Sequence, residues 1–197
     1  MHYPDPNTPI EETLETLNEL VQQGKVRAIG HSNFSAEQIN EAVSQANARD
    51  SVHFVTAQNE WSLLNRAVEA DAIPACDQHG LGQLPYFPLA SGMLTGKYRR
   101  GEDFAPGTRL AVLPFSQRMA SDENFAKVET LQDFAEQRGH TLLELAMSWL
   151  AAQPCVASVI AGATTPEQVR ANVAAPNWQL SAEELTQVDA LASSVPA

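Results

Sequence analysis

The sequence is poor in the residues that mark secreted and membrane proteins. Cysteine occurs only twice in 197 residues, at Cys76 and Cys155, which is too few for a disulfide framework and typical of free thiols in a reducing compartment. No apolar run approaches the ~18 residues that a membrane span needs. No basic segment followed by an apolar run marks a secretory signal. We therefore expect a cytoplasmic protein.

Positive charge is also scarce. Twelve Lys and Arg residues face 24 Asp and Glu residues, which gives a formal net charge of -12 and a pI near 4.7. This charge repels nucleic acids and anionic membranes, so we expect neither as a partner. It does not exclude an anionic cofactor, because a few cations and helix N-termini can hold a phosphate. The 44% of hydrophobic residues is ordinary for a globular domain with one sizeable core.

The residues that are present predict alternating helices and strands. Five Ser/Thr-x-x-Glu/Gln patterns, which begin at Thr8, Ser35, Thr141, Thr165 and Ser181, match the helix capping box. Apolar residues at helical spacing predict helices over 10–21, 39–46, 67–79, 125–135, 142–150, 166–173 and 182–191. Short apolar runs predict strands over 26–30, 54–57, 84–87 and 156–160. The alternation favours an α/β fold with parallel strands.

Polar clusters follow each predicted strand. They are residues 31–33, 58–60, 88–92 and 162–165. In parallel α/β folds the carboxyl ends of the strands form the active face. Gly162 allows close backbone approach, and Thr165 and Pro166 fit the N-cap and the first position of a helix whose free N–H groups would face an anion. These residues alone fit either a phosphate-bearing cofactor or an ordinary capped helix. The segment 98–119, rich in Gly, Pro and Arg, is typical of a functional loop.

Four segments, in order, resemble motifs of the aldo-keto reductase family. They are 9–35 with its ending GKVRAIGHSNFS, 58–66 (QNEWSLLNR), 86–98 (YFPLASGMLTGKY) and 162–172 (GATTPEQVRAN). The resemblance covers essentially the whole chain. It implies a partial (β/α)8 TIM barrel, roughly the last four βα units plus C-terminal helices, as one N-terminally incomplete domain over 1–197. It also implies an NADP(H)-dependent oxidoreductase that reduces aldehydes and ketones by hydride transfer.

The resemblance assigns a role to each site residue. Ser32, Asn33 and Gln58 would bind the nicotinamide carboxamide, and Tyr86 would stack on the nicotinamide ring. The other residues of the cofactor set are Phe87, Pro88, Leu89, Ala90, Ser91 and Lys97 at the pyrophosphate, Arg109 at the adenosine phosphate, and Gly162, Thr164, Gln168 and Asn172 at the adenosine end. His2 would donate a hydrogen bond to the substrate carbonyl.

The sequence departs from the family pattern at three points. The family places a proton-donating tyrosine, a lysine and an aspartate before the position of His2, and this sequence has no residues for them. Ala171 replaces an acidic residue and Phe87 a serine, so NAD(H) stays open beside NADP(H). We expect no metal site, because His31, His53, His79 and His140 lack metal-ligand spacing.

Three interpretations follow from these departures. The first is an inactive part of a carbonyl reductase, truncated or given too late a start. The second is a non-catalytic NADP(H)-binding regulatory subunit. The third is an assembly in which two copies complete one barrel. The carbonyl substrate and the oligomeric state stay open.

Overall fold

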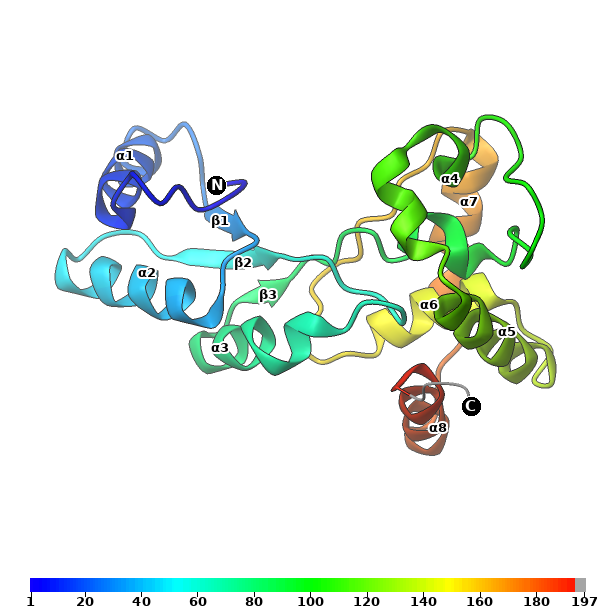
Figure 1. Ribbon diagram of the computed structural model, residues 1–197. Helices are drawn as coiled ribbons and strands as arrows, with labels where there is room; N and C mark the ends of the chain where they lie inside the picture. Colours follow the sequence, from blue (N-terminus) through cyan, green and yellow to red (C-terminus); the bar gives the residue numbers. More distant parts are fainter. Residues whose placement is uncertain (194–197) are drawn as a thin grey trace. The chain divides into compact units, whose positions relative to one another are not determined.

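Helices and parallel strands alternate in the first part of the chain. The computed structural model describes residues 1–193. The first elements are α1 (Ile10–Gln22), β1 (Ile29–Ser32), α2 (Ala36–Ala48), β2 (Phe54–Gln58), the 3₁₀ helix η1 (Ala67–Ala70), α3 (Ala72–His79) and β3 (Gly82–Gln83). The strands pair in parallel in the order β1-β2-β3 (Figure 1). An isolated parallel bridge joins Val156 to Gln83 and extends this order.

Helices dominate the rest of the chain. They are η2 (Ala90–Thr95), α4 (Arg109–Val112), η3 (Pro114–Met119), α5 (Asp122–Glu136), α6 (Leu142–Ala151), α7 (Pro166–Ala174), η4 (Ala175–Asn177) and α8 (Ala182–Ser193). The chain divides into two compact units. Unit 1 comprises residues 1–60, 67–86 and 155–158, and unit 2 comprises 61–66, 87–154 and, within the described part, 159–193.

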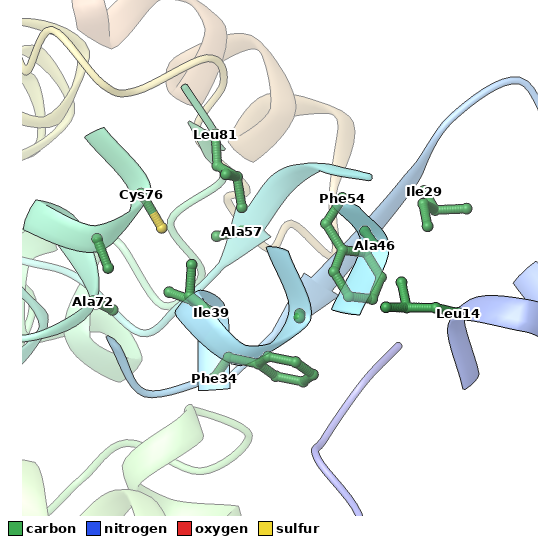
Figure 2. Close-up of a cluster of buried hydrophobic side chains, with 12 residues drawn as sticks. Leu14, Ile29, Phe34, Ile39, Ala46, Phe54, Ala57, Ala72, Cys76 and Leu81 are labelled. Carbon is green, nitrogen blue, oxygen red and sulfur yellow. The ribbon is translucent and has the colours of Figure 1, made fainter. Parts of the chain in front are cut away.

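The core of unit 1 lies between the sheet and its helices. Figure 2 shows apolar side chains from α1, α2 and α3 gathered with side chains from β1 and β2. Leu14 and Ala57 are fully buried, and Ile39 is 1% exposed. Burying a side chain of the size of leucine contributes about 2 kcal/mol. The helices are therefore held by packing against the strands that they connect.

Three of the predicted capping boxes form completely. The pairs Ser35 with Gln38 and Thr141 with Glu144 exchange side-chain and backbone hydrogen bonds. At Ser181 the backbone N–H donates to the Glu184 carboxylate at 2.8 Å, and the Glu184 N–H donates to the Ser181 hydroxyl at 3.2 Å.

The box predicted at Thr8 is wrong. The N-cap of α1 is Pro9, and no side chain caps this helix. The Thr8 hydroxyl instead donates to the carboxylate of Asp5 at 3.0 Å, which fixes the turn before the helix. The helix begins one residue later than the box requires, so Glu11 is at its second position and not at its third.

The predicted strand bounds need correction. Residues 26–28 are not in a strand, because the N–H of Val26 still bonds the Leu20 carbonyl at the end of α1, at 3.3 Å, and β1 begins at Ile29. The strand predicted over 84–87 is wrong, since β3 is Gly82–Gln83. Pro85 lacks the N–H that would continue the ladder. The run 156–160 forms isolated bridges instead of a strand.

The helix predicted over 67–79 is two helices. Asp71 separates η1 from α3 with φ -129° and ψ -79°, which are not helical angles. Its carboxylate accepts from the backbone N–H of Ala36 at 3.3 Å, at the start of α2. This contact with a distant helix explains a break that the local apolar pattern does not predict.

β1 and β2 approach so closely at Gly30 that no side chain fits there. A Cβ at this position would collide with the Thr56 hydroxyl and lie 3.1 Å from its carbonyl oxygen. We expect Gly30→Ala to lower the free energy of unfolding by about 2 kcal/mol, the usual cost of overpacking. Urea unfolding followed by far-ultraviolet circular dichroism measures this cost. In a Thr56→Ala background the cost should fall, and an equal cost in both backgrounds would contradict the collision.

Within residues 1–193, no helix is long and apolar enough to cross a membrane. In the same range, no three His, Cys, Asp or Glu side chains are grouped so as to hold a metal ion. Cys76 is buried, Cys155 is half-buried, and both are free thiols.

Candidate functional site

The site in unit 1 begins where β1 and β2 end. Ser32 is the last residue of β1, Asn33 follows it, and Gln58 is the last residue of β2. The Ser32 hydroxyl donates to the Gln58 carbonyl oxygen at 2.7 Å, and the Asn33 N–H donates to the same oxygen at 3.1 Å. The sequence predicts that His31 and Ser32 follow a strand, and in the structure they are the last two residues of β1. The carboxyl ends of neighbouring parallel strands bring these polar residues together.

The amide of Asn33 joins this pair to two further predicted residues. Its Nδ2 donates to the His2 carbonyl oxygen at 3.0 Å and to the Ser32 hydroxyl oxygen at 3.0 Å. Its Oδ1 accepts from the Tyr86 hydroxyl at 2.8 Å. Asn33 has φ 63°, a left-handed conformation that asparagine tolerates better than most residues. His2, Ser32, Asn33, Gln58 and Tyr86 therefore form one hydrogen-bonded cluster.

His31 lies outside this cluster, in the core. Its ring stacks on Phe34 with centroids 4.5 Å apart and meets Phe54 edge-on at 5.2 Å. Neither ring nitrogen has a hydrogen-bond partner among residues 1–193. Burial, and secondly the charge of the N-terminal amine, lowers the pKa of His31 to about 4. The ring is therefore neutral near pH 7 and serves as a packing residue.

In unit 2, the loop after Tyr86 has an unusual backbone. Phe87, Ala90, Ser91 and Gly92 have φ values of 53°, 45°, 58° and 97°. For the three residues other than glycine this conformation costs on the order of 1 kcal/mol or more each, which is typical of functional loops. The N–H groups of Ala90 and Gly92 donate to the carbonyl oxygens of Phe87 and Leu89, at 2.9 and 2.8 Å, so the loop closes on itself in tight turns.

Lys97 brings a positive charge to this loop. A Cβ on Gly92 would lie 2.8 Å from its Cε and 2.9 Å from its Nζ, so the absence of a side chain at Gly92 permits the approach. The ammonium also lies 5.0 Å from the centre of the Tyr98 ring. A lysine ammonium beside such a loop can hold a phosphate as a point charge.

Arg109 joins two more predicted segments of unit 2. It is the first residue of α4, and its guanidinium carbon lies 5.7 Å from the centre of the Phe87 ring. A Cβ on Gly162 would lie 2.9 Å from its Nη2. The guanidinium of Arg109 thus lies close to both Phe87 and Gly162.

The N-terminus of α7 completes this second cluster. Thr165 is the N-cap, and its side chain accepts from the Gln168 N–H. The Gln168 side chain does not close the predicted box, because its Oε1 accepts from the Thr164 N–H at 2.7 Å. The Asn172 amide donates to the Gly162 carbonyl oxygen at 3.5 Å. A helix N-terminus beside the Arg109 cation attracts anions.

The sequence motifs do not predict two residues that lie near this cluster. Ser116 is buried, and its hydroxyl accepts from the Ser91 hydroxyl at 3.1 Å. Phe115 stacks on Phe87 with centroids 6.4 Å apart and is 52% exposed. Both lie in the segment 98–119, whose composition predicts a functional loop without indicating which of its residues take part.

Comparisons with known proteins show which family the chain resembles. Residues 1–193 match the model of the Aldo/keto reductase family. A probable voltage-gated potassium channel subunit beta from Oryza sativa subsp. japonica is 37% identical over 99% of this chain and 61% of its own length. An NADH-specific methylglyoxal reductase from Escherichia coli (strain K12) is 38% identical over 95% of this chain and 55% of its own length.

Among solved structures, a glycerol dehydrogenase from Gluconobacter oxydans has a TM-score of 0.80 and 33% identity to this chain. The match covers 96% of this chain and 56% of that one. The chain thus spans little more than half the length of the relatives that it resembles.

Proposed function

Because this chain belongs to the aldo/keto reductase family, we propose that it forms the cofactor-holding part of an NADP(H)-dependent reductase of small aldehydes and ketones. The cluster of His2, Ser32, Asn33, Gln58 and Tyr86 carries this proposal, because residues far apart in the sequence meet through direct hydrogen bonds. NADP(H) is preferred to NAD(H) because of the cation Arg109. A direct comparison of the two affinities tests that choice.

The proposed fold is a partial (β/α)8 barrel over the domain 1–197. The parallel order β1-β2-β3, continued by the bridge from Gln83 to Val156, follows the chain order. Sequential parallel order without reversal is the arrangement of a barrel and differs from that of a doubly wound sheet. These four segments would be consecutive barrel units.

In unit 1, the proposed roles follow from the donors and acceptors present. Ser32, Asn33 and Gln58 offer the hydroxyl and amide groups that a carboxamide needs. The Tyr86 ring would lie on one face of the nicotinamide. The cofactor, when bound, supplies the hydride, and His2 would donate a hydrogen bond to the substrate carbonyl and stabilise the negative charge that develops on its oxygen.

In unit 2, the loop 87–91 and Lys97 would hold the pyrophosphate. Arg109 would bind the adenosine phosphate. Four residues at the start of α7 and before it would hold the adenosine, namely Gly162, Thr164, Gln168 and Asn172. The cations and the helix N-terminus supply positive potential locally, although the chain carries a net charge of -12.

Removing the charge of Lys97 tests the proposal directly. We expect Lys97→Met to weaken NADPH binding by at least about tenfold, because one hydrogen bond to a charged group is lost. Titration of the purified chain, followed by NADPH fluorescence, measures the dissociation constant. Lys25→Met is the matched control, since Lys25 is exposed and is not one of the proposed binding residues. Equal affinities of the two variants would argue against a phosphate site at Lys97.

A second candidate function is that of a non-catalytic NADP(H)-binding regulatory subunit. The resemblance to a probable potassium channel subunit beta favours it. The Tyr86 hydroxyl donates to Asn33, and the Tyr98 hydroxyl lies 3.5 Å from the Ser91 carbonyl oxygen. Both hydroxyls therefore already have an acceptor, which disfavours either tyrosine as the proton donor of a reductase. Oxidation of NADPH or NADH in the presence of methylglyoxal would exclude the regulatory subunit, and it would also contradict the interpretation of the chain as an inactive part of a reductase. A subunit of the second kind binds the cofactor and does not turn over.

The proposed setting is the cytoplasm, with a small carbonyl compound as the substrate. The two free thiols, Cys76 and Cys155, support a reducing compartment. No nucleic acid or membrane is proposed as a partner, because the chain is strongly acidic.

A further inference from the structure

The orientation of the Asn33 amide is determined by its neighbours. The His2 carbonyl oxygen can only accept, so the atom of Asn33 that faces it at 3.0 Å must be the N–H₂ nitrogen. The opposite atom is therefore Oδ1, and it faces the Tyr86 hydroxyl at 2.8 Å. The hydroxyl must donate to it. The proton of Tyr86 is thus committed to Asn33.

The Asn33 amide has few donors and acceptors left for further hydrogen bonds. Nδ2 has two hydrogens and donates to two acceptors, the His2 carbonyl oxygen and the Ser32 hydroxyl oxygen, each at 3.0 Å. Oδ1 has two lone pairs, of which Tyr86 takes one. Asn33 can therefore bind a further group only as an acceptor, through the second lone pair of Oδ1.

The partners of Asn33 are themselves held in place. The Tyr86 N–H donates to the Asn59 carbonyl oxygen at 3.0 Å, and Tyr86 pairs with Glu60 as a parallel bridge. The Asn33 N–H is anchored to the Gln58 carbonyl oxygen at 3.1 Å. The hydroxyl and the amide are thus attached to backbone that the sheet fixes, which is the condition for a preorganised recognition group.

We propose that Tyr86 is a positioning and specificity-determining residue whose hydroxyl orients the Asn33 amide. This inference rests on the proposed function. The oriented Oδ1 accepts from the N–H₂ group of the nicotinamide carboxamide, and the same amide holds the backbone of His2. The site therefore recognises the carboxamide by its hydrogen-bond donor, beyond the ring stacking that the family resemblance assigns to Tyr86.

Tyr86→Phe tests this role, because it removes the hydroxyl and keeps the ring. Three probes are titrated against the purified 197-residue chain. They are NADPH, its 3-acetylpyridine analogue, whose acetyl group has no N–H₂, and adenosine 2′,5′-bisphosphate, which has no nicotinamide. We expect the variant to bind NADPH about tenfold more weakly, the analogue with much less loss, and the bisphosphate unchanged.

The matched control is Tyr3→Phe. Tyr3 is 59% exposed and its ring lies 4.6 Å from that of His2, so this variant removes a hydroxyl near the same residue without touching Asn33. It should bind all three probes like the unsubstituted chain. Thermal melting of both variants confirms that they fold.

Three results would overturn the role of Tyr86. They are unchanged NADPH affinity in Tyr86→Phe, an equal loss for NADPH and for the acetyl analogue, and a matching loss for the bisphosphate. The last two indicate a merely structural effect. A folded unsubstituted chain that shows no saturable NADPH binding would instead overturn the proposed function, and this inference with it.

Discussion

The Asp189→Ala substitution is expected to lower the free energy of unfolding of unit 2 by about 3 kcal/mol. Asp189 lies on α8, and its carboxylate accepts from the indole N–H of Trp149 on α6 at 3.0 Å. The same carboxylate pairs with the Arg66 guanidinium at 2.9 Å. That guanidinium lies over the Trp149 ring at 5.0 Å. One carboxylate thus ties three segments of unit 2 together.

The size of the effect follows from burial. The Trp149 side chain is fully buried, so the substitution leaves its N–H without the acceptor that it has in the protein. Asp189 itself is 44% exposed, and solvent screening keeps the loss at the lower end of the range for buried ion pairs. Asp189→Asn should cost less, because its amide oxygen can still accept from the indole.

Urea unfolding followed by tryptophan fluorescence measures this cost. All three tryptophans, Trp61, Trp149 and Trp178, belong to unit 2, so the signal reports on that unit. Glu167→Ala is the control, because it removes the carboxylate of an exposed pair whose partner Arg170 is 75% exposed. That variant should change stability by less than about 0.5 kcal/mol. Similar losses of stability in Asp189→Ala and Glu167→Ala would refute the stabilising role of the contacts that Asp189 makes with Trp149 and Arg66.

Acidification is expected to destabilise unit 1 through His31. Burial between Phe34 and Phe54 holds the pKa of His31 at about 4, against an ordinary value of 6.5. The folded state therefore keeps the ring neutral, while the unfolded state takes up a proton below pH 6.5. The loss of stability caused by His31 is absent above pH 6.5, grows as the pH falls to about 4, and stays constant below that. It amounts to about 3 kcal/mol of lost stability.

The comparison with His31→Leu isolates this contribution. At pH 7 this variant should lie within about 1 kcal/mol of the unsubstituted chain, because it replaces an unpartnered buried ring by an apolar side chain. Between pH 6.5 and 4 it should lose less stability than the unsubstituted chain. Circular dichroism during urea unfolding at several pH values measures both curves. His53→Leu, at an exposed position, should leave the pH dependence of stability unchanged. If the unsubstituted chain and His31→Leu lost the same stability between pH 6.5 and 4, the assignment to His31 would be contradicted.

Local signals predicted the helices well and the strands less well. The capping boxes at Ser35 and Thr141 depend on residues three apart, so they are legible in the sequence and form as expected. The Thr8 box failed because α1 begins one residue later than the box requires, with Pro9 as its N-cap. The strand predicted over 84–87 failed because Pro85 has no N–H for the ladder, and β3 is limited to Gly82–Gln83.

The candidate site shows the same division. The family motifs predict the site residues one by one, and the structure groups several of them into a hydrogen-bonded cluster around Asn33 in unit 1 and a second cluster around Arg109 in unit 2. The motif around Tyr86 gives no sign that its hydroxyl donates to Asn33, 53 positions earlier. The composition of the segment 98–119 likewise does not predict that Arg109 reaches Gly162.

The amino-acid sequence by itself determined the family, the alternation of helices and strands, and which residue types are available for binding. These features depend on local periodicity, capping and contiguous motifs, which neighbouring residues establish among themselves. Only the tertiary structure decided which way the Asn33 amide points, that His31 lies in the core, and that Asp189 binds Trp149 and Arg66. Each of these depends on atoms that are distant in the chain and meet only when the strands and helices pack.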